Sequence, residues 1–85
     1  DTEGIINYAL AIKGIIFAVL IVQREDIVKL SLRSKGDFKV NLIANKYFQG
    51  GGHTNASGGI SYDSVNETIK KVEGIIKTYK EELNN

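Results

Sequence analysis

The sequence IIFAVLIVQREDIVKLSLRS, residues 15–34, decides the fold, because two strand patterns stand here with only a short polar link between them. Residues 15–22 form an unbroken apolar run rich in β-branched side chains, which favours a strand buried on both faces near the middle of a sheet. In residues 27–34 apolar and polar side chains alternate, as in a half-buried strand. We therefore expect an antiparallel hairpin, with Arg33 on the polar face at the end of its second strand.

Three further elements follow this hairpin. Asn41 is a competent N-cap for a short helix, which is expected to end with Gly50 in the left-handed conformation common after a helix. Residues 56–62 suit a third strand, and the capping box from Ser64 to Glu67 begins a long amphipathic helix. The order β-β-α-β-α predicts a small α/β domain in which the helices pack on a mixed β-sheet.

Length and composition describe one small domain. The chain has 85 residues, 42% of them hydrophobic and 25% charged, with no cysteine and one histidine. Neither a disulfide nor a metal site of thiolates or several histidines is therefore expected. The longest apolar run has eight residues against the roughly 20 of a membrane span, so we expect no membrane partner, and the absence of cysteine suits a cytoplasmic protein. The first residue, Asp1, suggests a piece of a longer protein.

The small net charge of +1 hides a basic middle section. Five bases stand there against one acid, Asp37, which gives a local charge of +4: Lys29, Arg33, Lys35, Lys39 and Lys46. Such a cluster attracts an anionic ligand if it surrounds a concavity, but it is equally compatible with a solvated surface.

The segment GGGHTNASGG, residues 50–59, follows this basic section and contains the single histidine, His53. Glycines lack Cβ atoms, so their N–H groups can converge on one ligand and the backbone can be approached closely, as a phosphate requires. The imidazole of His53 can add a hydrogen bond, and a helical turn over residues 53–57 would add its dipole. The alternative is a tight turn that His53 merely caps. The spacing matches neither a P-loop nor a dinucleotide fingerprint, and no catalytic acid–base pair is evident.

Two motifs together carry a family resemblance. The segment GGGHTNASGG resembles the glycine–histidine signature of the DHH-associated C-terminal domain of DHH-family phosphoesterases. The longer stretch KLSLRSKGDFKVNLIANKYFQGGGHTNASGG, residues 29–59, is similar to the core of that domain in the nanoRNase branch, which comprises oligoribonucleases and pAp phosphatases. The opening EGIINYALAIKG resembles the segment that leads into it. Residues 1–14 are thus expected to be a lead-in from a missing N-terminal domain, and residues 15–85 the DHH-associated substrate-binding domain.

The resemblance implies a division of labour. The missing DHH domain would bind two divalent metals, usually manganese, and hydrolyse a short oligonucleotide or pAp. This chain would hold the nucleotide by its phosphate through Arg33, Gly50, Gly51, Gly52 and His53, would supply no metal ligand or catalytic residue, and would not hydrolyse anything alone. No role is carried over to Thr54 or Asn55.

Two rival interpretations remain open. Related glycine–histidine domains look like appendages of some alanyl-tRNA synthetases, so the chain could be a nucleic-acid binding module without hydrolase activity. It could instead be a docking or dimerisation piece with residues 15–22 partly exposed, although a buried central strand explains that run without a partner.

Overall fold

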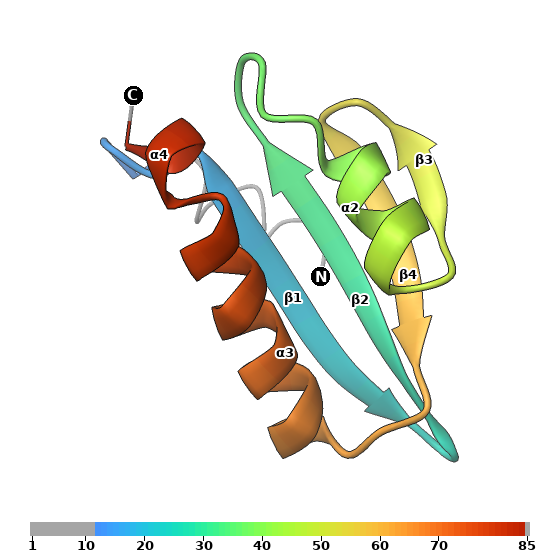
Figure 1. The fold of residues 1–85 in the computed structure, drawn as a ribbon. Helices are drawn as coiled ribbons and strands as arrows, with labels where there is room; N and C mark the ends of the chain where they lie inside the picture. The colour runs from blue at the N-terminus through green and yellow to red at the C-terminus, as the bar shows by residue number, and fades with distance from the viewer. Residues whose placement is uncertain (1–11, 85) are drawn as a thin grey trace.

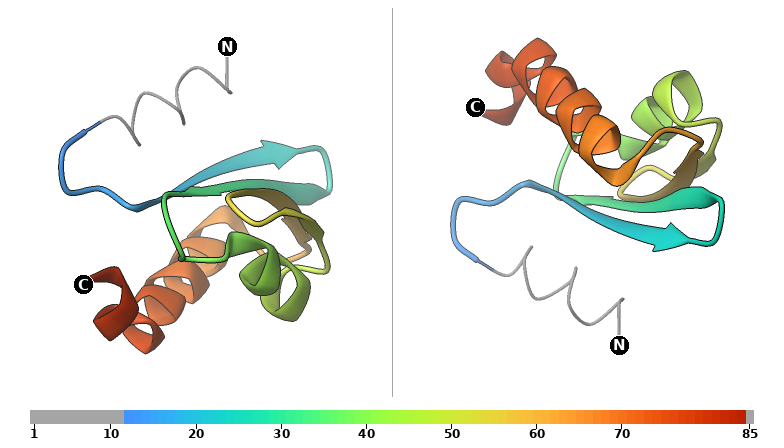
Figure 2. Two further views of the ribbon diagram at one scale, coloured as in Figure 1. Left: turned by 90° about the horizontal axis from the view of Figure 1, so that it is seen from above. Right: turned by 90° about the horizontal axis from the view of Figure 1, so that it is seen from below.

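The computed structural model describes residues 12–84, so most of the expected lead-in, residues 1–11, lies outside the described part. The described elements are β1 (Phe17–Arg24), β2 (Ile27–Ser34), α2 (Val40–Tyr47), β3 (Gly51–His53), β4 (Ala56–Ser61), α3 (Val65–Thr78) and α4 (Lys80–Leu83). The strands form one four-stranded sheet in the order β1-β2-β4-β3. Helices α2 and α3 lie side by side on one face of it (Figures 1 and 2). The α/β class and the predicted β-β-α-β-α elements are therefore confirmed.

The sheet differs from the mixed sheet expected from the sequence, because all three strand pairings are antiparallel. A single helix between two strands normally brings the second strand back parallel to the first. Here the chain leaves α2 through the additional strand β3, which turns into β4 and reverses the direction once more. Strand β4 consequently runs antiparallel to β2.

Of the two hairpin strands, β2 lies inside the described sheet and β1 lies at its edge. It pairs with β1 from Phe17↔Ser34 to Arg24↔Ile27 and with β4 along its other edge. The apolar residues of β1 are half-buried, so the prediction of a fully buried middle strand is wrong for residues 15–22. The unbroken apolar run suggested burial on both faces of the strand. In this edge strand, however, only the side chains that face the helices pack against the core. These side chains are those of Phe17, Val19 and Ile21.

Helix α2 is set by tertiary contacts at both ends. It begins at Val40 with Lys39 at the N-cap position, so Asn41 is not the cap. The N–H of Val40 donates instead to the carbonyl oxygen of Thr54, 2.8 Å away. At the other end the left-handed residue is Gln49, with φ of 52°, and not Gly50.

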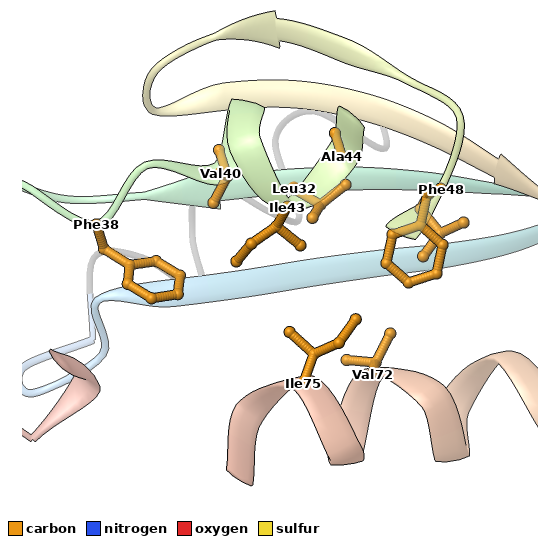
Figure 3. Packing of buried hydrophobic residues seen from close by; sticks show 9 residues of the cluster. Leu32, Phe38, Val40, Ile43, Ala44, Phe48, Val72 and Ile75 are labelled. Carbon is orange, nitrogen blue, oxygen red and sulfur yellow. The ribbon is translucent and has the colours of Figure 1, made fainter. Parts of the chain in front are cut away.

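Helix α3 begins as predicted, because the backbone N–H of Glu67 donates to the Ser64 Oγ at 3.1 Å. The core lies between this helix, α2 and the sheet (Figure 3). Burial of each large apolar side chain stabilises the fold by about 1.5–3 kcal/mol. Val72 and Ile75 of α3 are buried in this core, whereas Ile69 and Ile76 are 40% and 42% exposed. No helix within residues 12–84 has the length and hydropathy to cross a membrane.

Candidate phosphate-binding face

The glycine segment forms a β-hairpin instead of an open loop. Strand β3 pairs with β4 through Gly51↔Gly58, Gly52↔Ser57 and His53↔Ala56, and Thr54 and Asn55 make the turn. The helical turn expected over residues 53–57 is absent from this described region. The hairpin places β3 at the edge of the sheet, next to α2 (Figure 1).

The register brings Arg33 and His53 to the same face of the sheet. Arg33 pairs with Ala56, and Ala56 pairs with His53 on its other side. Directly paired residues of antiparallel strands point to the same face. Because the alternate residues of β2, Leu30 and Leu32, face the helices, this row lies on the opposite face, which we call the distal face.

The spacing of this row suits a small anion. Two strand spacings separate Arg33 from His53, about 10 Å between backbones, and the small side chain of Ala56 stands between them. Nη1 of Arg33 donates to the carbonyl oxygens of Leu32, at 3.0 Å, and Ser57, at 3.3 Å. Because Leu32 and Ser57 are paired, these bonds hold the guanidinium over the boundary between β2 and β4. A planar guanidinium and an imidazole N–H are both suitable donors to a phosphate.

The three consecutive glycines, predicted to act together, divide into two kinds. A Cβ on Gly50 would lie 1.9 Å from the carbonyl oxygen of Gly58. Gly52 has φ of +143°, and its Cβ would approach the Ala56 carbonyl oxygen to 2.8 Å. Both are therefore required by the hairpin itself. A Cβ on Gly51 would meet nothing within 4 Å, so the fold does not require glycine at this position.

Asn55 fixes the hairpin turn against the end of β2. Its Nδ2 donates to the Ser34 Oγ at 2.9 Å and to the carbonyl oxygens of Gly36 at 3.1 Å and Phe38 at 3.5 Å. The backbone carbonyl oxygen of Asn55 accepts a 3.0 Å hydrogen bond from the N–H of Ser34. These bonds hold the turn that follows His53 beside the residue that follows Arg33. No role was predicted for Asn55, although asparagine is a common turn residue.

The five bases of the middle section are not gathered into one cluster. Lys29 and Arg33 lie on the distal face of β2, and Lys35 follows the end of that strand. Lys39 is the N-cap residue of α2, and Lys46 lies in its last turn with Nζ 5.3 Å from the centre of the Tyr47 ring. The expected local charge is therefore spread around the sheet, and Arg33 is the base that shares a row with His53.

Comparison with known proteins shows the family of the chain. The family model of the DHHA1 domain matches residues 1–85. The chain belongs to the DHHA1 domain family. The DHHA1 domain is similar to an exopolyphosphatase-related protein from Bacteroides fragilis, with 39% identity and a TM-score of 0.93. That match covers 99% of this chain and 25% of the other, so the DHHA1 domain spans a quarter of that protein's length. No curated protein matches.

The DHHA1 domain is associated in its family with an N-terminal DHH domain and is typical of DHH phosphoesterases. The residues described here do not fit a metal centre, because within 12–84 no three His, Cys, Asp or Glu side chains are grouped to hold an ion.

Proposed function

We propose that this domain holds the phosphate of a nucleotide on its distal face while a DHH domain of the same protein hydrolyses the phosphoester. Arg33 and His53 would bind the phosphate from two sides, and the absence of side chains at Gly50, Gly51 and Gly52 would let it approach the backbone beside His53. The observation that carries the proposal is the shared row of Arg33, Ala56 and His53 on one face.

The shape of the surface supports a half-site instead of a complete pocket. One hollow, of about 390 Å³, is lined by other residues: Ile16, Lys35, Gly36, Asp37, Phe38 and Glu82. Arg33 and His53 lie instead on a sheet face, where one side of a ligand stays uncovered by these strands. A second domain that covers this face would complete the site and exclude water from it.

The mechanism we propose for this domain is positional. Fixing the terminal phosphate would orient the scissile bond toward the DHH domain, which would supply the divalent metal, expected to be manganese, and the attacking water. Binding in the correct orientation lowers the barrier without any chemistry by the binding residues. We place the parent protein in the nanoRNase branch, with short oligoribonucleotides or pAp as first substrates. Cyclic-dinucleotide breakdown products, single-stranded DNA and polyphosphate are the alternatives.

An NMR titration of the chain with pAp and with a 5′-phosphorylated dinucleotide tests the proposal. We expect shifts of the Gly51 and His53 amides, of the His53 ring and of the Arg33 side chain. Arg33→Ala should abolish these shifts. Arg24→Ala, at the far end of β1, is the matched control and should leave them unchanged. A folded chain whose signals stay still at millimolar ligand would contradict a phosphate site on this face.

The second candidate is a nucleic-acid binding module without hydrolase activity, favoured by Lys29 on the same face as Arg33. Oligonucleotide length separates the two functions. A terminal-phosphate site should bind a dinucleotide and a 12-nucleotide strand with similar affinity and a weak salt dependence. A strand-binding surface contacts several phosphates, so its affinity should rise with length and fall steeply with salt.

A further inference from the structure

The chain is unusual in the side chains that it offers to an oxidant, because it contains no cysteine, no methionine and no tryptophan. Cysteine and methionine are the side chains on which protein oxidation normally falls. Without them, the four tyrosines are the side chains that lose an electron most readily to a one-electron oxidant. Two tyrosyl radicals that meet form a covalent bond, so the contacts between tyrosines decide what such an oxidant does to this chain.

Two of the tyrosines, Tyr47 and Tyr79, lie in contact. Tyr47 is the last residue of α2 and Tyr79 stands between α3 and α4, and their hydroxyl oxygens are 3.5 Å apart. Both rings pack against the hydrophobic core, and the Tyr79 ring meets the Phe38 ring edge-on at a centroid distance of 6.0 Å. This packing keeps the two tyrosine rings together. Tyr62, by contrast, is 68% exposed.

Lys46 makes Tyr47 the more reactive member of the pair. The hydrogen bond with Tyr79 and the positive charge of Lys46, whose Nζ lies 5.3 Å from the centre of the Tyr47 ring, lower the pKa of the Tyr47 phenol. A deprotonated phenol gives up an electron more readily than a neutral one, so Tyr47 is the expected site of the first oxidation. Its radical then forms beside the Tyr79 ring.

We propose that Tyr47 and Tyr79 form an oxidative cross-linking site, at which a one-electron oxidant joins the two rings through a carbon–carbon bond and fixes α2 covalently to the end of α3. Each ring gives one electron to the oxidant and its hydroxyl proton to water. The two phenoxyl radicals couple at the carbons next to the hydroxyl groups, and the hydrogens on these carbons move to the oxygens as protons, which restores both phenols. The reaction uses two oxidising equivalents, removes two hydrogen atoms and leaves dityrosine.

The observed contact suits this coupling. In dityrosine the two hydroxyl groups stand on the carbons beside the new bond, close enough to hydrogen-bond to each other. The hydroxyl contact of Tyr47 and Tyr79 therefore brings the reacting edges of the two rings together. The new bond would join residues 32 positions apart and close a loop that contains β3, β4 and α3. Both rings pack on the helix-facing side of the sheet, so the inference does not depend on the phosphate site of the distal face.

Photo-oxidation of the dilute chain with a ruthenium bipyridyl complex and persulfate tests the proposal. Dityrosine fluorescence and the loss of two hydrogen atoms from the mass of the monomer report the reaction, and mass spectrometry of proteolytic peptides identifies the joined residues. Tyr47→Phe and Tyr79→Phe each keep the ring and remove one reacting phenol. Tyr62→Phe is the matched control. The same oxidation of the chain unfolded in urea measures how much coupling occurs without the contact.

We expect a bond between Tyr47 and Tyr79 in the folded monomer, with a yield about tenfold or more above that of the unfolded chain, because the contact replaces a random encounter. Tyr47→Phe and Tyr79→Phe should each lose the dityrosine signal of the monomer, and Tyr62→Phe should keep it. The cross-linked monomer should melt about 10 °C or more above the unmodified chain, since the closed loop restricts the unfolded state.

Two results would overturn the inference. Dityrosine that maps to Tyr8 or Tyr62, or that forms only between two molecules, would show that Tyr47 and Tyr79 are not a cross-linking site. An unchanged melting temperature of the cross-linked monomer would show that the bond does not fix α2 to α3.

Discussion

The two faces of the sheet use the same residue types for different purposes. On the helix-facing side Gly59 is glycine because Phe48 packs against its backbone, and Val28 and Leu32 are completely buried. On the distal face Gly51 stands in open space, with Arg33 and His53 in the neighbouring row. The comparison teaches that a glycine-rich segment is not one motif, because some of its glycines are required by close packing and others face open space.

The sharpest way to break this comparison is a pair of neighbouring substitutions. Gly50→Ala should lower the free energy of unfolding by about 3 kcal/mol or more, because its Cβ overlaps backbone that cannot move aside. Gly51→Ala should change it by less than about 0.5 kcal/mol. Urea denaturation of both variants measures the difference. Equal losses of stability would show that Gly50 and Gly51 are equally required by the fold, against the difference in their contacts.

The second effect concerns Arg33 on the distal face. In the protein that includes the DHH domain, Arg33→Ala should lower kcat/KM by roughly 10- to 200-fold, the loss of one charge-assisted hydrogen bond to a phosphate. Loss of its hydrogen bonds to the carbonyl oxygens of Leu32 and Ser57 should cost about 0.5–1.5 kcal/mol of stability each. Unchanged kinetics, with Arg24→Ala as the control, would remove Arg33 from the site.

A smaller effect is expected at Asn55, in the turn between β3 and β4. Asn55→Ala removes the donor shared by Ser34, Gly36 and Phe38 and should cost about 1–2 kcal/mol of stability. It should also weaken phosphate binding while the variant is fully folded, because the turn after His53 is no longer fixed beside Arg33. Titration well below the melting temperature separates the two results. A stability loss without any change in affinity would make Asn55 purely structural.

The smallest effect lies on the helix-facing side, between Tyr47 of α2 and Tyr79, whose hydroxyl oxygens are 3.5 Å apart. The bond to Tyr79 lowers the pKa of the Tyr47 phenol, with a further contribution from Lys46, and the same bond raises the pKa of Tyr79. A lowered pKa in the folded state increases the free energy of unfolding as the pH rises, whereas a raised pKa decreases it. The contributions of Tyr47 and Tyr79 therefore oppose each other in the alkaline range. Tyr79→Phe should return the Tyr47 pKa toward 10.0, as followed by ultraviolet absorbance, with Tyr62→Phe as the control.

Local patterns predicted the hairpin of residues 15–34, the strand near residues 56–62 and the capped start of α3. They failed where a distant segment decides the outcome. The start of α2 depends on the Thr54 carbonyl, not on Asn41, and the central place of β2 depends on its second partner, β4. Strand β3 was missed because its residues, two glycines and a histidine, carry no strand signal, although their partner strand β4 provides one.

For the site, sequence alone determined which residue types were present: one histidine, an arginine at a strand end and a glycine-rich segment between two elements. That Arg33 and His53 lie in one row was decided only by the tertiary structure. Residues 20 positions apart share a face here only through the register of β2, β4 and β3. The same register separated Gly51 from Gly50 and Gly52, which the sequence could not distinguish. The physical reason is that successive side chains of a strand point to opposite faces of the sheet. The alignment of the paired strands therefore decides which residues share a face.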